Sequence, residues 1–435
     1  MGKIISGYSI IILSAVLFAT ACKKDFLETK PLGEISQLDV WNDATLAESF
    51  VNGIYNRLEQ PLIKYSRSIF VDESQRRSNK NAQDFNNSLL TADKIPGWIG
   101  GNTDPYMYWD PLYASLRYCN LFFENISKVP DDGIVTDGKT IKQRLTGEVH
   151  FLRAWNYFNL TNLYGGVPII TKTYQLTDSL AAERSSYADC IKFIVADCDT
   201  AASLLPLVNS GNNKGRATMG AALALKAKVL LFAASDLHNT PAFPGYSNPG
   251  LLGYTDGNRM ERWQAAKDAA KAVIDLGQYS LYKADPAPGD DVSNNFVNMW
   301  LTTDNEEDIF VKYYIPTTTV YVQNMWLLNS PNGYHSQGNN TPIGNMVDAY
   351  EMADGTKFDW NDPVKAKEPY KNRDPRFYAD ILYEGAKWAK RPSDVIGIDP
   401  EGIIQVGKWI KWNSSTGAEE AVFGLDTPNG PIETN

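Results

Sequence analysis

The chain is poor in the side chains and motifs that most hydrolases and metalloenzymes use for catalysis. It has only three histidines among 435 residues, His150, His238 and His335, and no two of them have a spacing typical of metal ligands. It contains no G-x-S-x-G, H-E-x-x-H, C-x-x-C or phosphate-binding loop motif. The 51 acidic residues do not reveal a carboxylate pair for glycoside hydrolysis, because such a pair is defined by distance in the fold. These absences leave no catalytic residue that we can name, and we predict no metal ion and no cofactor.

Cysteine is scarce too, with four residues in the whole chain. Cys190 and Cys198 fall in one predicted helix, where a separation of eight residues places their Cα atoms ~12 Å apart, too far for a disulfide. Together with Cys119 they form an odd set, which is a poor basis for disulfide pairing. We expect these three residues to be buried free thiols.

The chain has no excess of positive charge. Its formal net charge is −10, which argues against nucleic acid as a partner, because phosphates require a basic surface. The same charge weighs against electrostatic binding of anionic glycans. Tryptophan and tyrosine are instead abundant, with 11 and 23 residues, and several lie in Gly-, Asn- and Pro-rich stretches. Aromatic side chains outside the core indicate a ligand with flat faces that can stack on them.

The N-terminus has the pattern of a lipoprotein signal peptide. Residues 1–3 are a short basic start, residues 10–19 are an apolar run broken only by Ser14, and Thr20 and Ala21 are small. Cys22 follows directly, as in a lipobox, so we predict that residues 1–21 are removed and Cys22 is acylated. An ordinary cleaved signal with an incidental cysteine is the alternative. No other apolar run reaches the ~20 residues that a membrane-spanning helix needs.

Helical periodicity dominates the first two thirds of the chain. Apolar residues recur at helical spacing over 44–58, 113–123, 142–163, 187–205, 217–235 and 263–274. We predict that Asp43 caps the first helix and that Trp155 and Trp263 lie on core faces. Helix pairs with small residues at their contacts are typical of tetratricopeptide-like stacking. The sequence therefore predicts a mostly α fold.

From about residue 278 the chain becomes rich in Pro, Gly, Asn and Asp. Segments 309–315 and 402–410 are candidate strands, and residues 285–295, 317–342 and 388–402 are candidate long loops. No linker separates this part from the first, so we predict one domain over 22–435, with a helical scaffold mainly at 40–277 and a loop-rich part at 278–435. Long loops on a rigid scaffold commonly carry binding residues.

Several stretches resemble the SusD/RagB family of nutrient-binding lipoproteins from Bacteroidetes. They are, in order, Asp25-Phe26-Leu27 after Cys22, Trp155-Asn156-Tyr157, Tyr164-Gly165-Gly166-Val167-Pro168, Gly215-Arg216-Ala217, Asn305-Glu306-Glu307, Asp348-Ala349-Tyr350-Glu351 and Asn372-Arg373-Asp374-Pro375-Arg376-Phe377. Their order and spacing extend over residues 22–377. The chain ends at Asn435 without the family's usual C-terminal helix, and we expect that segment to be missing.

The resemblance implies four tetratricopeptide-like helix pairs that carry a loop-rich binding face. It implies a lipid-anchored protein of the outer membrane that faces the cell surface. It also implies a SusC-type TonB-dependent transporter as partner, a glycan as ligand, and no catalysis. Two alternatives are a binder of peptides or glycopeptides for the same kind of importer, and a secreted glycoside hydrolase.

Starch-binding relatives cradle the glycan with aromatic residues from two loop regions. The corresponding regions here hold six candidate ligand-binding residues, namely Asp72, Arg77, Trp98, Asn102, Tyr321 and Trp326. The alternative is that the tryptophans hold long loops on the scaffold. We expect Arg373 and Arg376 to hold a turn through ion pairs, and we interpret the acidic run that begins at Asp304 as a solvated turn rather than a calcium site.

Overall fold

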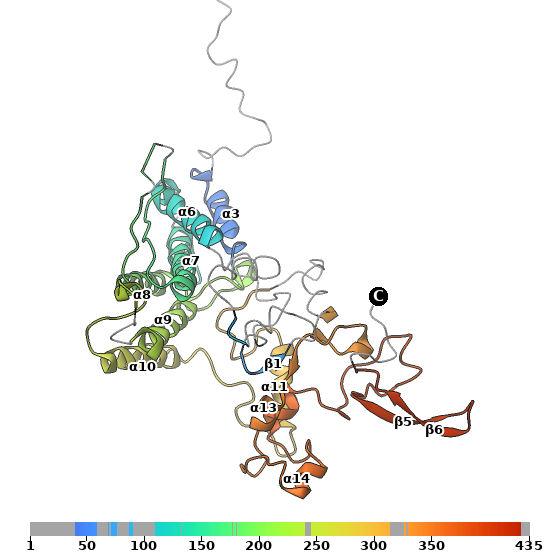
Figure 1. Ribbon diagram of the computed structural model, residues 1–435. Coiled ribbons are helices and arrows are strands. Elements are labelled where there is room, and N and C mark those ends of the chain that lie inside the picture. Colours follow the sequence, from blue (N-terminus) through green and yellow to red (C-terminus); the bar gives the residue numbers. More distant parts are fainter. Residues whose placement is uncertain are drawn as a thin grey trace, which may run out of the picture.

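The structure is a computed structural model, and it describes residues 40–58, 68, 71–75, 87–89, 109–131, 133–175, 177–179, 181–239, 245–313, 326, 327 and 329–427. Of the candidate site residues, Asp72 and Trp326 are described, whereas Arg77, Trp98, Asn102 and Tyr321 lie outside the described residues. The predicted lipidation site, Cys22, lies outside them as well. Figure 1 shows a stack of long helices from the first two thirds of the chain beside a part made of loops and short elements.

Within the described residues, six long helices form the helical stack. They are α3 (Ala44–Tyr55), α6 (Trp109–Asn125), α7 (Ile141–Tyr164), α8 (Tyr187–Leu204), α9 (Met219–Ala234) and α10 (Arg259–Asp275). From α6 to α10 each helix packs on the next along the chain, and α3 packs on α7 (Figure 1). This arrangement confirms the predicted mostly α, tetratricopeptide-like fold.

Side chains at the helix starts explain where these helices begin. Asp43 accepts hydrogen bonds from the backbone N–H groups of Thr45 and Leu46, at 2.7 and 3.1 Å, as predicted for an N-cap. Thr140 and Gln143 form a reciprocal capping box at the start of α7. These polar side chains pair with backbone N–H groups that have no partner within the helix. They thereby determine the residue at which each helix begins and which side chains face the core.

A buried charge cluster ties the stack together at its centre. The Glu148 carboxylate is fully buried on α7 and accepts hydrogen bonds from Arg144 and Arg216, both at 2.8 Å. Arg144 also reaches Glu48 of α3, at 2.6 Å. Burial raises the pKa of the Glu148 carboxyl, and the two guanidinium groups oppose that shift. The cluster joins α3 and α7 to Arg216, just before α9.

A double glycine ends α7 where the chain passes close to another turn. Gly165 has a φ of 71°, and a Cβ there would lie 2.2 Å from the Leu251 carbonyl oxygen. The neighbouring Gly166 N–H donates to that same oxygen at 2.6 Å. Only glycine permits both this backbone conformation and this approach.

The other elements that the structure describes are short. The helices are α11 (Val292–Leu301), α13 (Gly344–Ala349), α14 (Pro363–Lys367) and α15 (Pro375–Asp380), with 3-10 turns η4 (Ile126–Lys128), η5 (Gly211–Asn213), η6 (Asp236–His238), η7 (Pro249–Leu251) and η8 (Asn332–Tyr334). The antiparallel strand pairs are β1 (Ser74–Gln75) with β4 (Thr341–Pro342), β2 (Val135–Thr136) with β3 (Lys139–Thr140), and β5 (Lys408–Asn413) with β6 (Ala418–Phe423). The β5–β6 hairpin projects from the loop-rich part, as Figure 1 shows.

Several sequence expectations for this part were wrong. Residues 309–313 form no strand, and the strand expected over 402–410 begins only at Lys408. The end of the loop expected over 285–295 is instead the start of α11. Asp291 caps this helix by accepting hydrogen bonds from the backbone N–H groups of Ser293 and Asn294. Trp263 is 36% exposed rather than on a core face, since α10 packs through its alanines.

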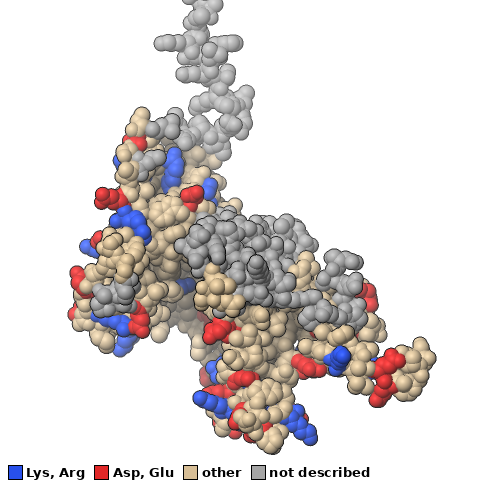
Figure 2. Space-filling model, viewed as in Figure 1, with Lys and Arg blue, Asp and Glu red and all other residues tan. Residues whose placement is uncertain are grey.

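The predicted free thiols are confirmed, because Cys119, Cys190 and Cys198 are buried and unpaired. Within the described segments, no helix is long and apolar enough to cross a membrane. On the face seen in Figure 2, basic and acidic side chains are interspersed over the described residues, and no broad basic surface gathers there.

Candidate functional site

Two indole rings lie face to face in the loop-rich part. The ring centroids of Trp326 and Trp388 are 5.4 Å apart and their planes are inclined by 16°. Tyr334 meets both rings edge-on, with centroid distances of 6.3 and 4.8 Å. Trp326 is 48% exposed whereas Tyr334 is 3% exposed. The Trp326–Trp388 pair therefore presents aromatic surface to solvent on a buried support.

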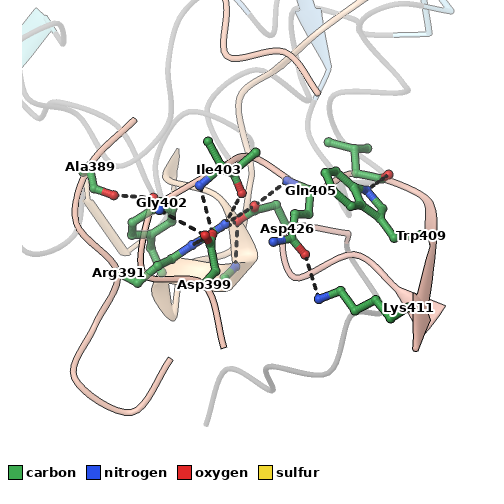
Figure 3. Close-up of polar contacts among 12 residues, drawn as sticks. Ala389, Arg391, Asp399, Gly402, Ile403, Gln405, Trp409, Lys411 and Asp426 are labelled. Atoms are coloured by element: carbon green, nitrogen blue, oxygen red, sulfur yellow. Dashed lines mark hydrogen bonds and ion pairs between the residues drawn. The ribbon is translucent and has the colours of Figure 1, made fainter. Parts of the chain in front are cut away.

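A buried arginine lies beneath this support. The Arg391 guanidinium carbon is 4.3 Å from the centre of the Tyr334 ring. Arg391 also forms ion pairs with Asp399 and Asp426, both at 2.8 Å, and all three side chains are almost fully buried (Figure 3). Burial opposes the charge of Arg391, but its hydrogen bonds to Asp426 and Asp399 outweigh that effect and raise its pKa. We call Arg391, Asp399 and Asp426 the Arg391 cluster.

The two aspartates of the cluster also bind backbone. Asp399 accepts from the N–H groups of Gly402 and Ile403, at 3.1 and 2.9 Å. Asp426 accepts from those of Gln405 and Gly333, at 2.9 and 3.2 Å. Figure 3 shows these contacts converging from separate turns of chain. The cluster therefore fixes the loops that carry the Trp326–Trp388 pair relative to one another.

The segment that contains Asp72 lies against the second loop region. The hydroxyls of Ser68 and Ser74 donate to the Asn340 side-chain oxygen, at 2.9 and 2.6 Å. The β1–β4 pairing continues this contact along the backbone. Asp72 is exposed beside this junction. The structure thus brings together two loop regions that are far apart in the sequence.

A pocket of about 260 Å³ lies at this junction. Its polar lining includes the side chains of Asn329, Asn332, Gln337, Asn340, Asp380 and Asp426. Amides and carboxylates offer the donors and acceptors that sugar hydroxyls require, and aromatic planes suit the C–H faces of sugar rings. The arrangement can bind a polar ring ligand.

Sequence reasoning missed most of this site. It named Trp326 but not Trp388, Tyr334 or the Arg391 cluster. Trp388 begins the segment 388–402, which the sequence predicts to be a long loop. That prediction was the only indication in the sequence that Trp388 could belong to a binding site. Arg376 forms the expected ion pair with Asp374 at 2.8 Å, which lowers the pKa of that carboxyl to about 2.

Two other sequence expectations have clear outcomes. Arg373 is buried and donates to the carbonyls of Pro369, Val347 and Tyr350. It forms no ion pair with a carboxylate of the described residues, so the expected ion pair was wrong for this residue there. The acidic run that begins at Asp304 is a largely exposed turn, as expected, and Asp304 forms an ion pair with Lys214 at 2.5 Å.

Comparisons with known proteins agree with this architecture. Residues 25–231 match a family profile described as "Starch-binding associating with outer membrane", and residues 291–428 match the profile of the SusD family. A SusD-like protein of Formosa agariphila is 25% identical over 228 residues, which cover 51% of this chain and 41% of that protein. A SusD-like protein of Bacteroides ovatus is 25% identical over 222 residues, or 51% of this chain and 38% of that protein.

Solved structures show the same likeness. A SusD-like protein from Bacteroides fragilis superposes with a TM-score of 0.61 and 28% identity, over 82% of this chain and 64% of that one. A SusD-like carbohydrate binding protein from the same species gives 0.57 and 23%, over 80% of this chain and 61% of that one. The chain thus spans less than two thirds of the length of these relatives. Two profiles of one family and the shared fold lead to one conclusion: the chain belongs to the SusD/RagB family.

Proposed function

We propose that the protein captures a glycan at the Trp326–Trp388 pair and passes it, chemically unchanged, to a SusC-type TonB-dependent transporter. The exposed indole surface on a buried support carries this proposal. Tyr334 and the Arg391 cluster hold the two indole rings in place. Ligand binding would therefore cost little side-chain conformational entropy. The amide-lined pocket of about 260 Å³, whose lining includes Asn340 and the β4 residues Thr341 and Pro342, would bind hydroxyl groups of the same ligand.

The proposal includes attachment to the outer membrane through acylated Cys22, with the binding face toward the medium. The lipobox-like sequence at residues 19–22 supports the anchor, and the family's description supports the location. Each buried CH₂ of an acyl chain contributes ~0.8 kcal/mol, so several chains on one residue give a stable tether.

The test is affinity electrophoresis of the mature chain with Cys22→Ser, in gels that contain single polysaccharides. We expect one polysaccharide to retard the protein. The double variant Trp326→Ala, Trp388→Ala should migrate freely, whereas Trp412→Ala, at a 65% exposed tryptophan of β5, should still be retarded. Retardation that persists in the double variant would place the site elsewhere.

The non-catalytic part of the proposal is tested separately. Purified protein incubated with the polysaccharide that retards it should release no new reducing ends. Their appearance above a heat-denatured control would show glycoside hydrolysis and contradict the proposal.

A further inference from the structure

A second pocket, larger than the amide-lined one, begins at Trp388. A groove of about 810 Å³ lies between the start of α11 and the chain from α15 to Trp388. This volume falls within the ~300–1,000 Å³ typical of ligand sites. Trp388 lines the groove and also stacks on Trp326, and Leu382 lines both the groove and the amide-lined pocket. The groove therefore continues the surface proposed above to bind glycan.

The aromatic residues of the groove are held in fixed positions. Tyr378 and Tyr383 line it, and each packs against the fully buried ring of Phe377 at a centroid distance of 5.2 Å. The Tyr378 hydroxyl donates to the Tyr370 carbonyl at 2.9 Å. Two tyrosine rings and one indole thus offer preformed planes for further sugar rings.

The charge of the groove is negative. Asp290, Asp291 and Lys387 are its charged lining residues. Lys387 is already paired with Glu401, at 2.7 Å, whereas neither aspartate forms an ion pair with a described cation. Hydrogen bonds from Ser293 and Asn294 lower the pKa of Asp291, so this carboxyl stays ionised at neutral pH. Asp380, in the adjoining pocket, adds another carboxylate.

We infer that this groove is a subsite for the continuing part of the glycan chain, and that it selects neutral sugars over uronates and sulfated sugars. The inference depends on the proposed function, because the ligand reaches the groove across Trp388. Carboxylates accept hydrogen bonds from hydroxyls, whereas anionic sugars would face Asp290 and Asp291 without a free cation among the described lining residues. The formal net charge of −10 adds to this repulsion.

The test compares matched polymers that differ in charge. The mature chain with Cys22→Ser is titrated by calorimetry with soluble starch, galactomannan and hydroxyethyl cellulose, and with the carboxymethyl derivative of each. We expect one neutral polymer to bind at least tenfold more tightly than its derivative at low salt. The difference should shrink as salt is added, because ions screen exposed charges.

Substitutions then place this selectivity in the groove. In Asp290→Asn, Asp291→Asn the charge is lost, but asparagine is still a good N-cap for α11. We expect the preference for the neutral polymer to fall at least threefold, because the affinity for the carboxymethyl derivative rises when the two negative charges are removed. The control is Asp359→Asn, Asp362→Asn, which makes the same change at residues that bind backbone near and at the start of α14. It should leave the preference unchanged.

A filling variant tests occupancy independently of charge. Ala386→Trp places a bulky ring in the groove, and we expect at least tenfold weaker binding of the polymer. If the polymer binds through Trp326 but neither the filling nor the charge variant changes affinity or preference, the groove inference fails and the proposed function stands. If no polymer binds to protein shown to be folded, both fail.

Discussion

Trp326 and Trp388 stack with their ring centroids 5.4 Å apart although they belong to segments that are far apart in the sequence. Trp388 packs against the exposed ring of Trp326 and also lines the groove. It links the two halves of the proposed glycan site.

Replacement of Trp388 by alanine should weaken binding of the glycan at least tenfold, which corresponds to ~1.4 kcal/mol. Trp388→Phe retains an aromatic plane and should lose less. Calorimetric titration measures both variants. The control is Trp360→Ala, at a tryptophan that is 55% exposed and bonds to Asp348 instead. Equal affinities for Trp388→Ala and the unmodified protein would contradict this prediction.

Loss of the Arg391 guanidinium should destabilise the site region. Arg391→Met leaves Asp399 and Asp426 buried without a cation, and breaking a buried pair in this way costs about 3–5 kcal/mol. We expect the variant to unfold at a lower denaturant concentration than the unmodified protein, and to be cleaved faster by protease within residues 329–427. Arg376→Met, at an exposed arginine, is the control and should leave both measurements unchanged.

Glu148→Gln should destabilise the helical stack by a similar amount, about 3–5 kcal/mol, because Arg144 and Arg216 would lose their shared carboxylate in the core. The matched control is Asp199→Asn, which breaks the exposed pair with Lys226 and should cost ~0–1 kcal/mol. Circular dichroism during urea unfolding gives both free energies. Similar values for the two variants would disprove the structural role of Glu148.

Gly165→Ala should cost more than Gly277→Ala, although both glycines have positive φ. At Gly277, with a φ of 62°, a Cβ meets nothing within 4 Å, so only the backbone strain of ~1–2 kcal/mol applies. At Gly165 the added carbon would also collide with the Leu251 carbonyl oxygen. Thermal unfolding of the two variants ranks them, and an equal loss would show that the turn adjusts freely.

The Cys119 thiol should be unreactive in the native protein. Burial raises its pKa from 9.0 to about 12, so the thiolate is rare at pH 8. The folded state favours the neutral thiol, so this group contributes stability below pH 9 that is lost as pH rises from 9 to about 12. In the Cys22→Ser chain, an aromatic disulfide reagent should label Cys119 only after unfolding. Rapid labelling of native protein at pH 8 would refute the prediction.

The sequence predicted elements whose causes are local. The start of α3 follows from Asp43, and the end of α7 follows from Gly165, whose N–H donates to the Thr161 carbonyl, because these contacts join residues a few positions apart. The approach of Leu251 to Gly165 joins distant parts of the chain and was not predicted. Trp263 was misplaced because periodicity identifies an apolar face but not whether another element covers it. In α10 the buried contacts are made by Ala266 and Ala269 instead.

The site was harder to predict because its residues meet only in the folded chain. Trp326 was a candidate through its local Asn-rich setting, whereas nothing near Trp388 in the sequence indicates the ring on which it stacks. Arg391 and Asp426 likewise form a pair that neither neighbourhood reveals. Contacts between distant loops depend on the path of the whole chain.

The shared carboxylate of Glu148 also restricts how this helical stack can change through evolution. A lineage that loses Arg144 or Arg216 alone would keep an unmatched charge in the core, whereas simultaneous replacement by apolar side chains of similar volume can be neutral. Among homologues, we expect the identities of residues 48, 144, 148 and 216 to covary, with the intact set or a fully apolar set far more frequent than any mixture.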